Sequence, residues 1–395
     1  MNRDARSRRQ VLAAIGSAAT AGLAGCGFTS LGDQGDSIDT ETSDNPAGPT
    51  DSATPSPRTE TTTSTSYEAC MEPVGCLTFD EPPERWVAND GIYCDMGVAL
   101  GLADQLGGIG SPRRYYTGYY EELPGVTLDK TNYPALSRGT RMPKEPFYAV
   151  DADIHLIDPA WLTNTFGWTE TDVEEIATNV GPFFGNYIRE QHDVWHTYRY
   201  YSLSEVFGKV AGLFGRRSRY EKWKAIQSEL TDDIQSRLPD DRVELLLLRP
   251  QGIPPRSFFP QYIGDSVSDL QWQVVEVDDT LKGSGIPEWG TRIDYETIAR
   301  IDPEVIVMET QFADDFVLEE SFREFVLGHM REHSVARNLT AVENDRVHAG
   351  GINYQGPLIS LFQTEQAARI AYPDEFGEEE LFDRDRVARM VTEGG

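Results

Sequence analysis

The sequence is poor in the side chains that bind bare metal ions. Its 395 residues include 6 histidines and 4 cysteines, and the histidines form no cluster in one loop, which argues against a free metal ion as the ligand. The cysteines at positions 70, 76 and 94 lack the Cys-x-x-Cys spacing of zinc sites. A metal site formed by these three cysteines stays open, but we expect one local disulfide and one buried cysteine. Cys70 and Cys76 would close a short loop, although the sequence does not decide the pairing.

Positive charge is also scarce. The chain has 35 lysines and arginines against 65 acidic residues, a net charge of −30 and a pI near 4.5. Such a surface repels nucleic acids and anionic membranes, so nucleic-acid binding is excluded. The acidic residues are spread along the whole chain, which suits a protein kept soluble in high salt, where charge repulsion is screened. We therefore infer a halophilic source.

A membrane-spanning apolar run is missing at the N-terminus. The apolar stretch at 11–24 is shorter than the roughly 20 residues that a spanning helix needs. It follows four arginines, and Ser7–Leu12 resembles a twin-arginine export signal. Leu23–Cys26 resembles a lipobox, in which cleavage exposes a cysteine for lipid attachment. We predict a signal peptide at 1–25 and an extracytoplasmic protein held at the outer face of the cell membrane by a lipid on Cys26.

Residues 26–66 consist largely of Ser, Thr, Asp, Pro and Gly and contain almost no aromatic residues. Such a composition cannot bury enough apolar surface to fold. We expect a disordered tether that holds the folded part away from the membrane, and the sequence leaves open whether it is glycosylated.

Two blocks of alternating strand and helix pattern follow, at 67–203 and 239–376, before an acidic tail or short helix at 377–395. The first block is expected to contain strands at 85–89, 108–109 and 152–158, a helix at 92–102, and a basic, aromatic loop at 111–120. The second is expected to contain strands at 242–248, 272–277, 304–308 and 346–348, a loop at 252–260 and a helix at 294–300. Alternation of this kind predicts parallel sheets, hence an α/β fold with two Rossmann-like lobes.

One sequence motif, called here the repeated phrase, occurs in both blocks with the same spacing. It consists of a glutamate, two apolar positions, an aspartate and the start of a strand. The first copy runs from Glu145 through Asp151 to Ile154, and the second runs from Glu296 through Asp302 to Val305. This repeat supports two lobes of related architecture. Ligands of open α/β sheets bind beyond the carboxyl ends of the strands, so two facing lobes would enclose a cleft.

A long helix is predicted between the blocks, at 204–238, with a break at Gly215. Ser218 and Glu221 have the spacing of a capping box, and Pro239 ends the helix. One apolar face is formed by residues three or four apart, namely Trp223, Ile226, Leu230, Ile234 and Leu238. We interpret this helix as one rigid strut that joins the lobes.

Several stretches resemble the substrate-binding lipoproteins of ABC importers for iron–siderophore and cobalamin-type ligands, the class III periplasmic binding proteins, and in particular their haloarchaeal members. The resemblance covers roughly residues 78–376 and is carried by Pro83–Ala88 leading to Leu100–Gly101, the phrase around Glu296, Leu339–Val347, Gly350–Pro357 and Ala371–Phe376. It implies two α/β lobes joined by one long helix, little flexing, and no catalytic chemistry. It also implies a monomer that takes no cofactor and carries a ferric siderophore, or alternatively haem or cobalamin.

In this family a glutamate on each lobe docks against arginines of the permease dimer, which works with its ATPase. The resemblance places this role on Glu145 and Glu296, the leading residues of the repeated phrase. The alternative is two solvated glutamates that the helix dipole favours.

Ligand contacts are expected from loops that follow strands. Arginines suit anionic ferric chelates, and aromatic rings supply flat apolar walls. The candidates from the first block are Tyr93, Arg113, Arg114, Tyr115, Tyr116 and Trp161. Those from the second block are Arg256, Phe258, Phe259, Trp289, Gln311 and Tyr354.

A zinc metalloprotease is the alternative from a different class. His329-x-x-Glu332-His333 matches the inverted zinc-protease order, and His192 and His196 have the i, i+4 spacing of a zinc pair. The second pair has Asp193 where the catalytic glutamate would stand, and no third ligand is evident for the first. Ordinary surface or core histidines explain both patterns better.

Overall fold

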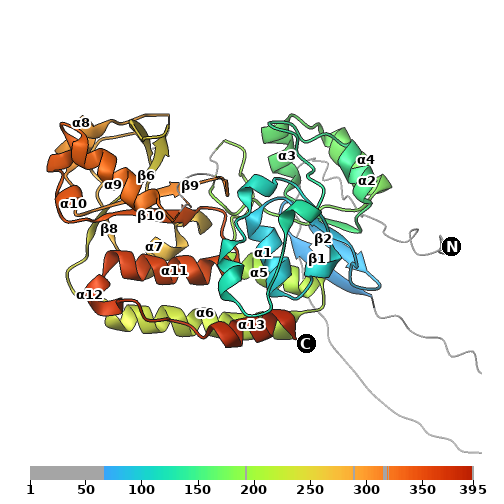
Figure 1. Ribbon diagram of the computed structural model, residues 1–395. Helices are drawn as coiled ribbons and strands as arrows, with labels where there is room; N and C mark the ends of the chain where they lie inside the picture. Colours follow the sequence, from blue (N-terminus) through green and yellow to red (C-terminus); the bar gives the residue numbers. More distant parts are fainter. Residues whose placement is uncertain (1–65, 192–193, 288–289, 315–317, 319, 394–395) are drawn as a thin grey trace, which may run out of the picture.

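The computed structural model describes residues 66–191, 194–287, 290–314, 318 and 320–393 (Figure 1). The predicted signal peptide, Cys26, nearly all of the tether, His192, Asp193 and Trp289 lie outside this range. Within it, no helix is both long and apolar enough to cross a membrane.

The first described element is a hairpin of β1 (Tyr67–Met71) and β2 (Gly75–Phe79). Cys70 pairs with Cys76 across it and forms a disulfide with it, whereas Cys94 is a buried free thiol. The expected local disulfide and buried cysteine are both confirmed.

The N-terminal half contains a parallel sheet of order β4–β3–β5, formed by Leu106–Ile109, Trp86–Ala88 and Ile154–Leu156. The C-terminal half contains a larger sheet of order β10–β9–β6–β7, in which β8 pairs with β6 and only β7 runs antiparallel. Its strands are β6 (Glu244–Gln251), β7 (Ser257–Pro260), β8 (Asp278–Asp279), β9 (Val305–Thr310) and β10 (Val347–Ile352). The two sheets lie in different halves of the molecule (Figure 1), as two α/β lobes require.

Helices cover both sheets. The N-terminal half has α1 (Gly91–Ala99), α2 (Glu145–Val150), α3 (Pro159–Phe166) and α4 (Glu170–Asn179), followed by α5 (Leu203–Leu213) and α6 (Arg217–Arg237). The C-terminal half has α7 (Leu270–Val275), α8 (Tyr295–Ile301), α9 (Phe322–Glu332), α10 (Thr340–Glu343), α11 (Pro357–Ala371) and α12 (Pro373–Phe376). The last helix, α13 (Arg384–Thr392), returns to the N-terminal half and packs against α1 (Figure 1). Helix α13 therefore forms in the segment expected to be a tail or a short helix.

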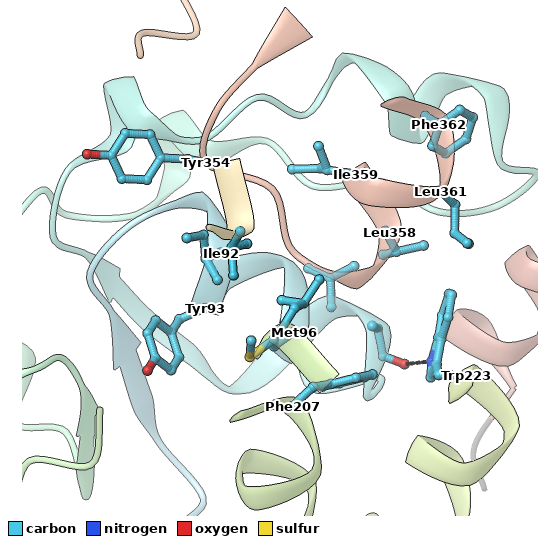
Figure 2. Packing of buried hydrophobic residues seen from close by; sticks show 14 of the residues in the cluster. Ile92, Tyr93, Met96, Phe207, Trp223, Tyr354, Leu358, Ile359, Leu361 and Phe362 are labelled. Carbon is cyan, nitrogen blue, oxygen red and sulfur yellow. Dashed lines mark hydrogen bonds between the residues drawn. The ribbon is translucent and has the colours of Figure 1, made fainter. Parts of the chain in front are cut away.

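Helix α6 runs beneath both halves (Figure 1). Its 21 residues span about 30 Å. Toward the N-terminal half, Trp223 Nε1 donates to Ala99 O at 2.8 Å (Figure 2). At the other end the guanidinium of Arg237 lies 4.5 Å from the ring centroid of Phe376. The helix thus contacts both halves, and the predicted break before it is confirmed at Gly215, where φ is +65°.

The predicted start of this helix is wrong in detail. Helix α6 begins at Arg217 with Arg216 as N-cap and no side-chain cap, so Ser218 already lies inside the first turn and forms no capping box. The apolar face was predicted correctly, since its first four members are buried, and Leu238 is the C-cap.

Helix α11 is a second connection between the lobes. It has no side-chain cap of its own at Gly356. Instead Asp95, a buried residue of α1, accepts from Leu358 N at 2.7 Å and Ile359 N at 3.1 Å, and Tyr120 donates to the same carboxylate at 2.5 Å. Residues of α1 and α11 pack together in Figure 2. The prediction of one connecting helix was therefore incomplete.

The repeated phrase has the same conformation in both lobes. Helices α2 and α8 end at Asp151 and Asp302, which have left-handed φ values of 53° and 50°. Each turn leads into a buried parallel strand, β5 or β9. The repeat is thus a helix–turn–strand unit.

Two element predictions in the second block were wrong. The stretch 272–277 is mostly helix α7, because its apolar side chains pack against α11 and the tertiary context outweighs their preference for strand. The end of the loop at 252–260 forms β7, which returns antiparallel along β6.

Candidate functional site

A cluster of arginines and aromatic rings lies between the two lobes. The Arg114 guanidinium lies 5.5 Å from the ring centroid of Trp161 and 5.2 Å from that of Tyr354. Arg189 lies 5.2 Å from the same Tyr354 ring. Two cations of the N-terminal lobe therefore share one buried ring of the C-terminal lobe, the arrangement of a cation–π contact.

The N-terminal lobe supplies these arginines from two loops. Arg114 belongs to a 3-10 turn that follows β4. Arg189 lies on the long connection between α4 and α5; its Nε donates to Tyr187 Oη at 2.9 Å and its guanidinium pairs with Glu190. The Tyr187 ring in turn stacks on Trp161, with centroids 5.8 Å apart and planes 10° apart. The aromatic rings thus orient both guanidinium groups.

A buried carboxyl group stands next to the arginines. Asp90 is the N-cap of α1, and its carboxylate accepts from Ile92 N and from Asn89 Nδ2. Burial raises the pKa of Asp90 to about 6, against the opposing charge of Arg114. At neutral pH Asp90 is mostly ionised and partly balances the positive charge.

A cavity of about 310 Å³ lies beside Arg189 and is lined by both lobes. Its walls are Arg189, Glu190, Gln191, Tyr200, Pro260, Gln261, Tyr262, Gly264, Asp265, Ser266, Ser268, Asp269, Glu309 and Asn353. Burial raises the pKa of Glu309 to about 8, although Trp272 and Gln271 donate to its carboxyl at 2.7 and 2.8 Å. Glu309 is therefore mostly protonated and neutral at pH 7.

Three buried polar atoms in this region have no hydrogen-bond partner among the described residues. They are Asn89 Oδ1, Arg114 Nη1 and Asn353 Oδ1. A buried polar atom without a partner is costly, and a ligand or water between the lobes would satisfy it. On the β6 strand, burial and the nearby charge of Arg189 lower the pKa of Arg249, so a third guanidinium stands close to the cluster.

A contact between loops joins the lobes at Arg113. Its Nε pairs with Asp314 at 3.0 Å, its guanidinium lies 4.4 Å from the Phe312 ring centroid, and its carbonyl accepts from Ala313 N at 2.5 Å. Since the Arg113 side chain is 63% exposed, this pair lies at the rim. Gln311 is half-buried in the same loop.

The twelve predicted ligand residues fall into different environments. Arg114, Trp161 and Tyr354 form the cluster, and Arg113 and Gln311 lie at its rim. Tyr93 is buried and hydrogen-bonded to Asn186, and Trp289 lies outside the described residues.

Five others lie in the core or toward the outside. Tyr115 is buried in the core, with its hydroxyl 2.7 Å from that of Tyr120, and Phe258 is buried against Tyr295. Tyr116 is half-buried against Tyr119. Phe259 lies under Arg249 and Arg292, and Arg256 is exposed near His329.

Sequence reasoning missed Asp90, Arg189, Arg249 and Glu309. Arg189 had one available signal. The stretch 180–202 between α4 and α5 has no helix or strand in its described part, and long connections of this kind in compact domains are usually functional. Glu309 also had an available signal, since it is a carboxyl group that directly follows the apolar run Val305–Met308 near the carboxyl end of a fully buried strand.

The two predicted docking glutamates are exposed. Glu145 begins α2 and Glu296 lies in the first turn of α8. Both helices lie at the end of the molecule opposite α6, one in each half (Figure 1). The helices that carry Glu145 and Glu296 therefore lie at the same end, one in each lobe.

The zinc-protease motif does not assemble a site. His329 lies in α9 and His333 caps it, with ring centroids 6.3 Å apart. Throughout the described part of the chain, no group of three or more His, Cys, Asp or Glu side chains converges as metal ligands do. The protease interpretation is unsupported.

No protein-family profile and no curated protein matches the sequence, but solved structures match the fold. A periplasmic binding protein from Veillonella parvula aligns over 78% of this chain and 98% of its own, with 14% identity and a TM-score of 0.56. An ABC-type Fe3+-hydroxamate transport protein from Saccharomonospora viridis aligns over 80% and 99%, with 18% identity and a TM-score of 0.52. The petrobactin-binding protein YclQ from Bacillus subtilis aligns over 80% and 100%, with 12% identity and a TM-score of 0.54. The chain therefore has the two-lobed α/β fold of the periplasmic binding proteins.

Proposed function

We propose that this protein is an extracytoplasmic substrate-binding protein that captures a ferric chelate between its lobes and delivers it to an ABC importer. The observation that carries the proposal is the cluster of Arg114, Arg189 and Tyr354 between the lobes. It is supported by the fold, which is shared with proteins named for Fe3+-hydroxamate and petrobactin. The role is capture without turnover, and the protein is not an enzyme.

The charge of the cluster favours an anionic chelate. Guanidinium groups bind carboxylate and catecholate oxygens through charge-assisted hydrogen bonds, and the aromatic rings offer flat walls for an apolar ligand frame. A ferric siderophore of negative charge fits these groups best, with haem as a second choice because it combines carboxylates with a flat ring. Cobalamin, which lacks carboxylates, fits least well.

A fluorescence titration tests this assignment. Trp161 lies in the cluster, so a bound ferric chelate should quench tryptophan emission of the mature protein in high salt. The panel contains a ferric tris-catecholate, a ferric hydroxamate, haemin and cyanocobalamin. We expect saturable quenching by the tris-catecholate with the highest affinity, whereas no quenching by any member would contradict the proposal.

We further propose that Glu145 and Glu296 dock against the permease dimer, and that a lipid on Cys26 and a tether over 26–66 keep the monomer close to it. Two carboxylates at one end of a two-lobed protein can pair with a two-fold partner through charge-assisted contacts. The lobes would then be 67–203 and 239–376, with the helix 204–238 between them and an acidic C-terminal tail or short helix at 377–395.

Charge reversal tests the docking role. The double variant Glu145→Lys/Glu296→Lys should abolish uptake and the stimulation of the importer's ATPase, while chelate affinity stays within twofold of wild type. Glu170→Lys is the matched control, because Glu170 is an exposed glutamate in the first turn of α4 outside the repeated phrase. An equal loss of chelate affinity in the double variant would refute docking.

A further inference from the structure

The loop that carries Arg189 depends on support from elsewhere. Over its described part the stretch 180–202 has neither helix nor strand, apart from one bridge between Phe183 and His155. Irregular backbone of this length holds a side chain in place only if other groups fix it. The contacts at the base of this loop show which groups hold the loop, and through it the position of Arg189.

Asn186 ties the two arms of this loop together. Its side-chain Nδ2 donates to Arg199 O at 2.9 Å and to Glu72 O at 2.8 Å. Its backbone N and O both bond to the Tyr93 hydroxyl at 2.7 Å. Since the residue is fully buried, this is the base from which the loop projects toward Tyr187 and Arg189.

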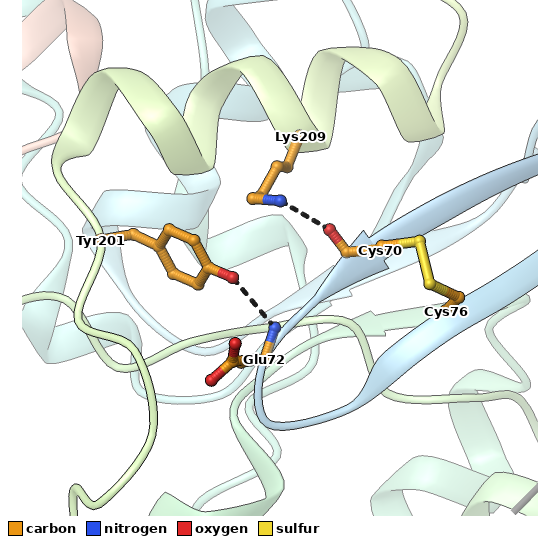
Figure 3. Close-up of a disulfide and its surroundings, with 5 residues drawn as sticks. All are labelled: Cys70, Glu72, Cys76, Tyr201 and Lys209. Carbon is orange, nitrogen blue, oxygen red and sulfur yellow. Dashed lines mark hydrogen bonds between the residues drawn. A yellow bond between two sulfur atoms is a disulfide. The ribbon is translucent and has the colours of Figure 1, made fainter. Parts of the chain in front are cut away.

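The tip of the β1–β2 hairpin contacts the same base through Glu72, whose bond to Tyr201 is drawn in Figure 3. Arg199 N donates to Glu72 Oε2 at 2.9 Å, and Glu72 N bonds to the Tyr201 hydroxyl at 3.3 Å. Glu72 thus contacts both arms of the loop. Its carbonyl bonds to Asn186 on one arm, and its amide and carboxylate bond to Tyr201 and Arg199 on the other. One residue at the tip thus contacts three positions of the loop base.

The hairpin tip is itself closed by the Cys70–Cys76 disulfide. These cysteines are paired across the hairpin and lie 6 positions apart. Lys209 Nζ donates to Cys70 O at 2.8 Å (Figure 3), and Met71 is buried in the core. A covalent bridge at this point restricts the conformations of the tip, so the disulfide limits where Glu72 can lie.

We infer that the disulfide-closed hairpin tip is a positioning device for Arg189. It holds Asn186 and Arg199 together and thereby fixes the loop with the guanidinium facing the cleft. Glu72 and the two cysteines are positioning residues that never touch the ligand. The consequence for binding rests on the proposed function, whereas the effect on the loop does not.

Hydrogen–deuterium exchange of the full mature chain tests the effect on the loop. In Cys70→Ser/Cys76→Ser and in Glu72→Ala, peptides covering 183–191 should exchange at least fivefold faster than in wild type. Glu72→Gln keeps a side-chain acceptor for Arg199 N and should restore wild-type exchange. Glu68→Ala, at an exposed position on the same hairpin, is the matched control and should leave exchange unchanged.

Peptides of β9 report whether the fold as a whole has loosened. If they exchange as in wild type while the loop accelerates, the effect is local, as inferred. Unchanged exchange of the loop in both Glu72→Ala and the double serine variant would overturn the inference, and so would equal acceleration in Glu72→Gln.

Binding of a ferric tris-catecholate is the second readout. Affinity should fall about tenfold in Glu72→Ala and return to within twofold of wild type in Glu72→Gln. Faster loop exchange without any loss of affinity would overturn the positioning role. If wild type binds no chelate but the exchange results hold, the proposed function fails and the hairpin's hold on the loop stands.

Discussion

The two lobes present different chemistry to the space between them. The N-terminal lobe contributes Arg114 and Arg189, two of the three guanidinium groups of the cluster. The C-terminal lobe adds Arg249 and the buried carboxyl of Asp269, whose pKa, raised by burial to about 6, leaves it mostly ionised at neutral pH. Its Glu309 and Asn353 side chains are buried and mostly uncharged. An anionic ligand should therefore hold its charge toward the N-terminal lobe and its neutral polar groups toward the other.

The lobes also differ in how these groups are held. Glu309 lies within β9 and Asn353 directly follows β10, so the parallel sheet places both. Arg114 and Arg189 lie on loops and depend on stacked rings and hydrogen bonds. The arginines that select charge are thus held by the least regular backbone of the site. The β1–β2 hairpin compensates for this by fixing the loop that carries Arg189.

The largest expected effect on stability comes from weakening the contact between the lobes at the start of α11. Asp95→Ala removes the acceptor for Leu358 N and Ile359 N at the start of α11. Buried donors without a partner are costly, so the free energy of unfolding should fall by about 3 kcal/mol. Urea unfolding in high salt measures this change.

Asp95→Asn is the internal control. It keeps an acceptor oxygen, and burial already raises the pKa of Asp95 to about 7, so a neutral amide should cost about 1 kcal/mol or less. Equal destabilisation by alanine and asparagine would show that the capping contact is not the cause.

Removing one cation tests which lobe selects charge. Arg189→Ala should weaken binding of a ferric tris-catecholate by about 2 kcal/mol, or roughly 30-fold, because a charge-assisted contact is lost. Isothermal titration measures the affinity. Arg113→Ala, at the exposed rim, should change it less than threefold, since exposed ion pairs contribute little. Similar losses in the two variants would place the charge selection elsewhere.

The protonated carboxyl of the C-terminal lobe predicts a pH dependence. Its folded pKa, about 8, lies above the ordinary value of 4.5, so folded Glu309 keeps a proton that the unfolded chain loses. The contribution of this proton to the free energy of unfolding is complete below pH 4.5 and is lost as pH rises to about 8. The free energy of unfolding should fall by on the order of 1 kcal/mol per pH unit in this range.

Glu309→Gln mimics the protonated form and should flatten the stability profile between pH 5.5 and 8. Urea unfolding at several pH values measures the slope, and Glu145→Gln, an exposed position, should leave it as in wild type. A slope unchanged by Glu309→Gln would assign the pH dependence to other buried carboxyls, such as Asp90.

Two long helices show what the sequence could and could not reveal. Helix α6 has one buried face and one exposed face, so the spacing of Trp223, Ile226 and Leu230 predicted it. Helix α11 is buried on nearly all sides and therefore has no polar face whose period would identify it as a connection. Its cap, Asp95, lies more than 260 positions away in the sequence.

The same limit explains the site residues. Arg114, Trp161 and Tyr354 were predicted because arginines and aromatic rings in loops suit a chelate. Tyr115 was predicted by the same argument, yet it is fully buried beside Tyr120. Residue type cannot tell which way a loop side chain points, since neighbours far apart in the sequence decide it.

The sequence by itself determined the local units: the helix–turn–strand repeat and the apolar face of α6. Each depends on residues within a few positions of one another, so spacing carries the information. Only the tertiary structure decided that Arg189 meets Arg114 over Tyr354, that Asp95 caps α11 and that the hairpin tip holds the Asn186 loop. These contacts join distant segments, and their geometry arises only when the lobes pack against each other.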